Sequence, residues 1–128
     1  MADNTKKIII VEDEPDTAEM FAEMMRLSGY HVIKLFGSSS AMSMIRKEKP
    51  DAVLLDIMMP DVSGLEVLRN IRSDKNLKDI PVVVISAKSL LSDIRLGMDA
   101  GATVYLTKPV AFLELRKAVE NAILRGGK

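Results

Sequence analysis

Four short apolar runs in this chain each end at a charged or hydroxyl-bearing residue, and this pattern constrains the fold most. The runs cover residues 8–11, 52–55, 82–85 and 104–106, and a fifth run covers residues 32–35. The four are rich in β-branched side chains and show no alternation of apolar and polar residues. Such runs are typical of strands that are buried on both faces of a parallel sheet.

Segments with a helical period separate these runs. We expect helices over residues 15–28, 38–47, 63–72, 89–100 and 111–125. Pro15 starts the first of them and Gly29 stops it. The fourth carries Leu90, Ile94 and Met98 as its apolar stripe. Strands that alternate with helices, joined by right-handed crossovers, predict an α/β fold with a doubly wound, five-stranded parallel sheet.

The composition limits the class of protein. A chain of 128 residues fits one domain, residues 1–128, with a core from about residue 7 to 124. Eighteen basic residues balance eighteen acidic ones, and phosphate-neutralising nucleic-acid binders normally carry a basic excess, so direct nucleic-acid binding is not expected. The chain has no cysteine for a disulfide or thiolate metal site, and no apolar stretch that could span a bilayer. A soluble cytoplasmic protein without a membrane partner is the simplest interpretation.

Acidic side chains follow two of the apolar runs. Glu12 and Asp13 come directly after the first run, and Asp56 follows the run at residues 52–55. Because parallel strands place their carboxyl ends at one edge of the sheet, we expect these acids to meet there. Carboxylates so placed must raise a pKa or recruit a cation. An oxygen-only cluster suits Mg²⁺, which binds one or two carboxylates and keeps part of its water.

A hydroxyl and a lysine follow the other two runs. Ser86 can donate to an oxyanion, and Lys108 brings a compact positive charge to the same edge. Together with a divalent ion, Lys108 offsets the three carboxylates, so that the edge can admit a phosphoryl group. Asp56 stands alone at its strand end and is the candidate nucleophile. Singly, these acids would fit solvated loop residues or a helix cap; their joint placement with Lys108 favours a site.

Several separate motifs occur in a fixed order along the chain. They are Glu12-Asp13, residues 56–64 (Asp-Ile-Met-Met-Pro-Asp-Val-Ser-Gly), Ser86-Ala87, Gly101-Ala102 and residues 105–109 (Tyr-Leu-Thr-Lys-Pro). This combination resembles the receiver domain of the response regulators of two-component, histidine-aspartate phosphorelay signalling. The resemblance covers residues 7–124 approximately, and it implies a flavodoxin-like (βα)5 fold with strand order 2-1-3-4-5.

The resemblance also implies a role for each matching residue. Asp56 would accept a phosphoryl group from a sensor histidine kinase or a histidine phosphotransfer protein, with Ser86 and Lys108 holding phosphoryl oxygens. Ser86 and Tyr105 would be the switch residues, and the bond between Lys108 and its proline would be cis. Mg²⁺, with Mn²⁺ as a substitute, would be bound as follows: directly by Asp13, Asp56 and the backbone carbonyl of Met58, and through water by Glu12.

A receiver signals to a partner instead of turning over an external substrate. The resemblance implies that the protein catalyses its own phosphorylation and slow dephosphorylation, and that the face formed by the fourth helix, fifth strand and fifth helix contacts an output partner or a second copy. Departures from the family pattern are small: Glu12 stands where aspartate is frequent, and Ser86 replaces the commoner threonine. Both a stand-alone regulator and the receiver of a longer protein fit this sequence.

Three other kinds of protein share parts of the pattern. A flavodoxin-like cofactor binder needs small, donor-rich residues after its first strand, whereas residues 12–15 here are Glu-Asp-Glu-Pro. A haloacid-dehalogenase-type hydrolase has a second aspartate two residues after its nucleophile, where this chain has Met58. A pseudo-receiver, a phosphorylation-independent interaction module, usually lacks one of the acids or the lysine. All of them are present here, and the pseudo-receiver remains the alternative.

Overall fold

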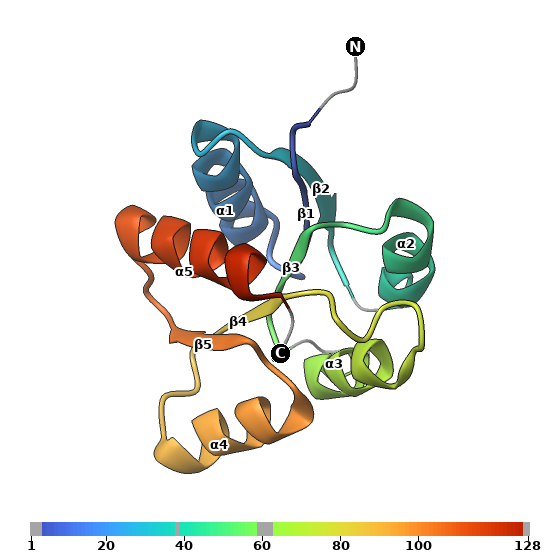
Figure 1. Cartoon of the computed structure of the whole chain (residues 1–128). Coiled ribbons are helices and arrows are strands. Elements are labelled where there is room, and N and C mark those ends of the chain that lie inside the picture. The colour runs from blue at the N-terminus through green and yellow to red at the C-terminus, as the bar shows by residue number, and fades with distance from the viewer. Residues whose placement is uncertain (1–3, 38, 59–62, 127–128) are drawn as a thin grey trace.

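The computed structural model describes residues 4–37, 39–58 and 63–126. Ser38, at the expected start of the second helix, lies outside them. So do residues 59–62 of the motif that begins at Asp56, and both ends of the expected domain, residues 1–3 and 127–128. Figure 1 draws these residues as a thin grey trace.

Five strands alternate with five helices in the described part of the chain (Figure 1). The strands are β1 (Lys7–Val11), β2 (His31–Leu35), β3 (Ala52–Leu55), β4 (Val82–Ser86) and β5 (Val104–Thr107). The helices are α1 (Pro15–Leu27), α2 (Ala41–Glu48), α3 (Gly64–Ser73), α4 (Leu91–Ala100) and α5 (Phe112–Arg125). None of these helices is long and apolar enough to cross a membrane.

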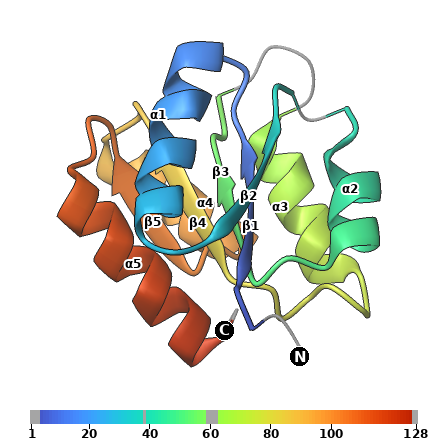
Figure 2. The same cartoon turned by 90° about the horizontal axis from the view of Figure 1, so that it is seen from above.

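All strand pairs are parallel, and the strand order is β2-β1-β3-β4-β5. Helices α1 and α5 cover one face of the sheet, while α2 and α3 lie on the other (Figure 2). Two separate apolar clusters result, one between the sheet and α1 with α5, the other between the sheet and α2 with α3. The predicted doubly wound architecture is therefore confirmed, including the order of the strands.

The central strands are buried almost throughout, and the two edge strands are buried only in part. Every residue of β3 and β4 is buried, as are residues 8–11 of β1. In β5 only Leu106 is buried, so the prediction that this run is buried on both faces is wrong. A strand at the edge of a sheet has a neighbouring strand on one side only. Its other side is therefore buried only where a helix covers it. Strand β2, at the opposite edge, is also only half-buried.

Helix α4 differs most from its prediction. Its buried residues are Gly97 and Ala100, whereas Met98 is exposed and Leu90, the residue before the helix, is 69% exposed. The apolar stripe predicted for this helix is therefore wrong at two of its three positions. Two small residues allow α4 to approach its neighbours closely, and the large apolar side chains remain outside. Helix α3, by contrast, buries Val67, Leu68 and Ile71 on the core face.

Candidate functional site

Three carboxylates lie together at the carboxyl ends of β1 and β3. Val11 pairs with Leu55 in the parallel register, so the residues that follow them are neighbours. The backbone N–H of Asp56 donates to the carbonyl of Val11 at 3.0 Å, which continues this register by one residue. Carboxylate oxygens of Glu12, Asp13 and Asp56 all lie within 4.8 Å of one another. The structure thus brings together the acids that the strand ends predicted.

Lys108 reaches these acids from the far edge of the sheet. It follows β5, and its backbone N–H donates to the carbonyl of Ser86 at 2.9 Å. The peptide bond that joins it to Pro109 is cis, as the family resemblance implied. Its Nζ donates to Oε1 of Glu12 at 2.8 Å and to Oδ2 of Asp56 at 3.1 Å. One ammonium group therefore bridges two carboxylates from different strands.

Backbone N–H groups hold the second oxygen of each bridged carboxylate. Oδ1 of Asp56 accepts from the N–H of Met58 at 2.9 Å, and Oε2 of Glu12 accepts from the N–H of Glu14 at 3.2 Å. Charge-assisted hydrogen bonds of this kind fix the orientation of a side chain. The Asp56 carboxylate is consequently held on both sides, by the Met58 N–H and by the Lys108 ammonium group.

Burial decides the electrostatics of the cluster. Glu12 is 2% exposed and Asp56 is 6% exposed. Desolvation raises the pKa of Glu12 above its ordinary value, against the hydrogen bond from Lys108, which lowers it. Desolvation also acts to lower the pKa of Lys108, but the hydrogen bond that Lys108 donates to Glu12 and the charge of Asp56 outweigh it, so the pKa of Lys108 is raised. Lys108 is therefore protonated at neutral pH.

The acidic cluster fits a hard divalent cation. The three acids offer carboxylate oxygens only. Because Asp13 is half-buried, the cluster remains accessible to solvent at that residue. Lys108 neutralises one of the three negative charges, which leaves an excess of negative charge for a cation to balance. Oxygen ligands combined with access for water match the preference of Mg²⁺ for few protein ligands and several waters.

Ser86 and Tyr105 are linked through the backbone of one residue, Lys88. Ser86 is fully buried at the end of β4, and its Oγ accepts from the N–H of Lys88 at 3.1 Å. The hydroxyl of Tyr105 donates to the carbonyl of Lys88 at 2.8 Å. The Tyr105 ring packs on α4 so closely that a Cβ at Gly97 would lie 2.7 Å from its Cδ2. Sequence reasoning missed this link, because a backbone peptide leaves no signal in the sequence.

The predicted residues thus fall into two groups. Glu12, Asp13, Asp56 and Lys108 form one cluster, in which Lys108 contacts Glu12 and Asp56 and the three acids offer oxygens within 4.8 Å of one another. Ser86 ends the neighbouring strand, where its hydroxyl is bound to the connection before α4. Met58 contacts Asp56 through its backbone, and its side chain is exposed.

Known proteins share both the sequence and the fold. The chain is 36% identical over 120 residues to the transcriptional regulatory protein TcrX of Mycobacterium tuberculosis, which covers 94% of this chain and 50% of TcrX. It is 33% identical over 117 residues to the polar-differentiation response regulator DivK of Brucella ovis, which covers 89% of this chain and 95% of DivK. The chain therefore spans about half the length of TcrX and nearly all of DivK.

Among solved structures, the fold matches the receiver domain of the sensor histidine kinase PA1611 from Pseudomonas aeruginosa PAO1. The TM-score is 0.86 at 28% identity, over 93% of this chain and 98% of that one. That structure has a magnesium ion coordinated in its active site cleft. The family described as "Response regulator receiver domain" matches residues 8–120. With this match over most of its length, the chain belongs to the receiver domain family of the response regulators of two-component signalling.

Proposed function

We propose that the protein is a phosphoacceptor whose Asp56 takes a phosphoryl group from a phosphohistidine of a sensor histidine kinase or a histidine phosphotransfer protein. One observation carries this proposal. The buried Asp56 carboxylate is held between the ammonium group of Lys108 and the N–H of Met58, beside two further acids. In this proposed function, residues 1–128 are one receiver domain, and the domain acts in the cytoplasm. Neither a membrane nor a nucleic acid is a direct partner.

The proposed transfer uses Asp56 as the nucleophile. A carboxylate oxygen of Asp56 bonds to phosphorus while the phosphorus–nitrogen bond of the donor breaks, and the electron pair leaves with the imidazole. Nζ of Lys108 already lies 3.1 Å from Oδ2 of Asp56. Its ammonium group can therefore bind and stabilise a negatively charged oxygen of the phosphoryl group on Asp56. The hydroxyl of Ser86 can donate to a second oxygen. Slow hydrolysis of the acyl phosphate would return Asp56 to its carboxylate form.

The test is direct phosphorylation of the purified protein. With Mg²⁺ and a small phosphodonor such as acetyl phosphate, we expect the intact mass to increase by one phosphoryl group. Reductive trapping followed by peptide mapping should place the label on Asp56. A protein that stays unlabelled with small donors and with phosphorylated kinases would instead be a pseudo-receiver, which uses this fold only for interaction.

Mg²⁺ belongs to the proposed site, with Mn²⁺ as a substitute. Asp13, Asp56 and the carbonyl of Met58 would hold the ion directly, and Glu12 would contact it through water. The bound ion would neutralise charge on the transferring phosphoryl oxygens. The chain itself supplies the negative charge that attracts the ion and the lysine that shares the phosphoryl oxygens with it.

We expect Mg²⁺ to raise the melting temperature, because the ion binds the folded cluster and relieves its carboxylate repulsion. At 100 times the Kd, binding to the folded state adds about 2.7 kcal/mol to the free energy of unfolding. Asp13→Asn should remove more than half of the Mg²⁺-dependent shift in differential scanning fluorimetry. Asp16→Asn is the matched control, because Asp16 is an exposed acid in the first turn of α1. Equal shifts in the two variants would place the ion elsewhere.

The proposed readout of phosphorylation runs through Ser86, Lys88 and Tyr105. When Ser86 turns toward a phosphoryl oxygen, its hydroxyl releases the N–H of Lys88, and the carbonyl of Lys88 is the acceptor for Tyr105. The ring of Tyr105 in turn rests on Gly97 of α4. One change at Ser86 thereby reaches α4 through two hydrogen bonds and one packing contact.

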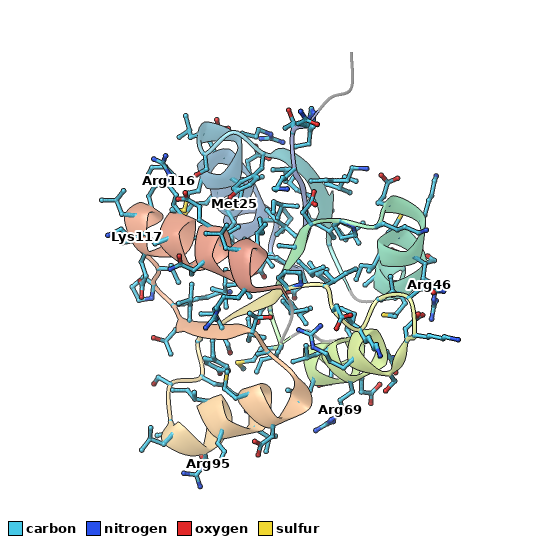
Figure 3. All side chains as sticks on the ribbon, viewed as in Figure 1. Met25, Arg46, Arg69, Arg95, Arg116 and Lys117 are labelled. Carbon is cyan, nitrogen blue, oxygen red and sulfur yellow. The ribbon has the colours of Figure 1, made fainter. Side chains whose placement is uncertain are left out.

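The output surface in this proposal consists of α4, β5 and α5. The polar candidates for lining the contact are Arg95, Asp99, Glu114 and Lys117, which are all exposed; Figure 3 labels Arg95 on α4 and Lys117 on α5. An output domain, another protein or a second copy of the chain would bind there, and in the last case the protein would form a homodimer. Sedimentation of the phosphorylated protein would separate the homodimer from the other two.

We expect beryllofluoride with Mg²⁺, a stable mimic of the phosphoryl group, to change the amide shifts of residues 86–100 and of Tyr105. The reason is the hydrogen-bonded chain from Ser86 to α4. A two-dimensional amide NMR map with and without the mimic measures this, and Asp56→Asn with the same additives is the control. Changes that stay within the loops after β1 and β3 would contradict transmission through this face.

A further inference from the structure

Arg72, in the last turn of α3, binds four oxygen atoms at the end of the sheet opposite the carboxylates. Its Nε donates to the carbonyl of Gly101 at 2.8 Å. Its Nη1 donates to the carbonyls of Lys78 at 3.0 Å and Ile80 at 2.6 Å, and its Nη2 donates to Oγ1 of Thr103 at 3.2 Å. One guanidinium group therefore joins α3, the connection to β4, the end of α4 and the residue before β5.

These contacts fix the C-terminal end of α4. Gly101, which ends the helix, has a φ of +118°, and a Cβ there would lie 2.5 Å from Cγ of Arg72. Arg72 thus packs against the end of the helix as well as binding its carbonyl. The two residues of α4 that are buried, Gly97 and Ala100, also lie in the last four positions of the helix.

The N-terminal end of α4 is held much less firmly. Its N-cap residue is Leu90, which makes no side-chain cap hydrogen bond, and Leu91 is 80% exposed. Asp93, in the first turn of the helix, and Leu96, just past its middle, line a cavity of about 150 Å³ together with Ile57 and Leu65. A segment with few buried apolar contacts opens at a lower free energy than a well-packed one. The two ends of α4 therefore differ in how many contacts hold them.

The loose end is the one that follows the phosphoryl-sensing residue. Ser86 ends β4, and only the four residues 87–90, among them Lys88, connect it to α4. We infer that Arg72 is the pivot of the switch: it holds the C-terminal end of α4 in place, so that a change at Ser86 swings the N-terminal end. This inference rests on the proposed function. Arg72 touches neither a phosphoryl group nor a metal ligand, and it acts as a positioning residue for the output face.

If Arg72 is the pivot, the movement of α4 should decrease from its N-terminal end to its C-terminal end. Ser92 should move on loading with beryllofluoride and Mg²⁺, and Asp99, seven residues nearer the pivot, should not. The chain has no cysteine, so pairs of introduced cysteines carry spin labels without a background. Pulsed electron spin resonance would measure the distance from a label at Glu23, an exposed position of α1, to a label at Ser92 or at Asp99.

In Arg72→Ala, the distance distribution to Asp99 should broaden with and without the mimic. Arg69→Ala is the matched control, since Arg69 is an exposed arginine on the same helix (Figure 3). Gly101→Ala is a second variant, in which the new Cβ presses on Arg72 from α4. It should broaden the same distribution if the contact between the two residues is what fixes the helix end. Arg72→Lys, which keeps the charge without the planar fork of donors, should be intermediate.

A second measurement tests the pivot without loading the site. In hydrogen exchange of the free protein, amides in the first turn of α4 should exchange faster than those in the last turn. Arg72→Ala should raise exchange of the last turn by about tenfold, while Arg69→Ala leaves it unchanged. Uniform exchange along α4, or equal movement of Ser92 and Asp99, would overturn the pivot. Failure of beryllofluoride to bind, seen by fluorine NMR, would overturn the proposed function and leave the exchange result to decide the pivot.

Discussion

Asp56→Asn is expected to abolish phosphorylation by both small donors and kinases. The substitution removes the negative charge and the nucleophilic oxygen pair, and it keeps an oxygen that can accept from the N–H of Met58. The loss should therefore be one of chemistry and not of folding, because an asparagine fills the same volume. Intact-mass spectrometry over a time course with acetyl phosphate and Mg²⁺ measures the effect, with circular dichroism as the check on the fold.

The control for this variant is an acid that lies outside the cluster. Asp16→Asn changes the net charge by the same amount at an exposed position, and it should be labelled at the wild-type rate. Labelling of Asp56→Asn at that rate would assign the acceptor to another residue. Partial labelling of both variants, mapped to different peptides, would indicate nonspecific phosphorylation by the donor.

Gly64→Ala should destabilise the fold strongly and damage the same site. A Cβ at Gly64 would lie 2.4 Å from Cα of Ile57 and 2.5 Å from the carbonyl oxygen of Asp56. Both are backbone atoms, so no side chain can turn away to relieve the clash. Either α3 or the end of β3 must shift, at a cost of about 3 kcal/mol, the upper part of the range for overpacked cores. A shift at the end of β3 would move Asp56 away from Lys108.

Urea unfolding followed by circular dichroism measures the stability of this variant, and the phosphorylation rate per folded molecule measures its site. Gly29→Ala is the control, because no atom lies within 4 Å of a Cβ at that position. Alanine at the φ of +94° found at Gly29 still loses about 1 kcal/mol of stability from backbone strain. The control therefore measures backbone strain without a steric clash. Equal losses of stability in the two variants would show that the contact between Gly64 and Asp56 is relaxed at no cost.

The sequence predicts the fold and the acidic cluster for the same reason. Runs of β-branched residues such as those before Glu12 and Asp56 form parallel strands, and parallel strands bring their carboxyl ends together. The functional side chains that follow each run must then lie close together at one edge of the sheet. The contact of Lys108 with Glu12 and Asp56 could be expected from this geometry alone, although its two distances could not.

What the sequence could not predict depends on tertiary contacts of small residues and of the backbone. The periodicity of α4 selects Leu90 and Met98 as the core stripe, whereas the structure packs Gly97 on Tyr105 and leaves both larger residues outside. A glycine carries no hydrophobic signal. Similarly, the acceptors of Arg72 are mostly backbone carbonyls, which every residue possesses, so nothing in the sequence distinguishes Arg72 from exposed arginines such as Arg69.

The two edges of the sheet differ in their resistance to pairing with a foreign strand. Lys34, the fourth of the five residues of β2, forms an ion pair with Glu19 and stands over the ring of Phe36. A strand that added to this edge would have to disturb that pair, and an edge lysine is a common defence against aggregation. Strand β5 carries no charged residue. Unwanted association is thus discouraged beside α1, and the uncharged edge is the one flanked by the proposed output helices.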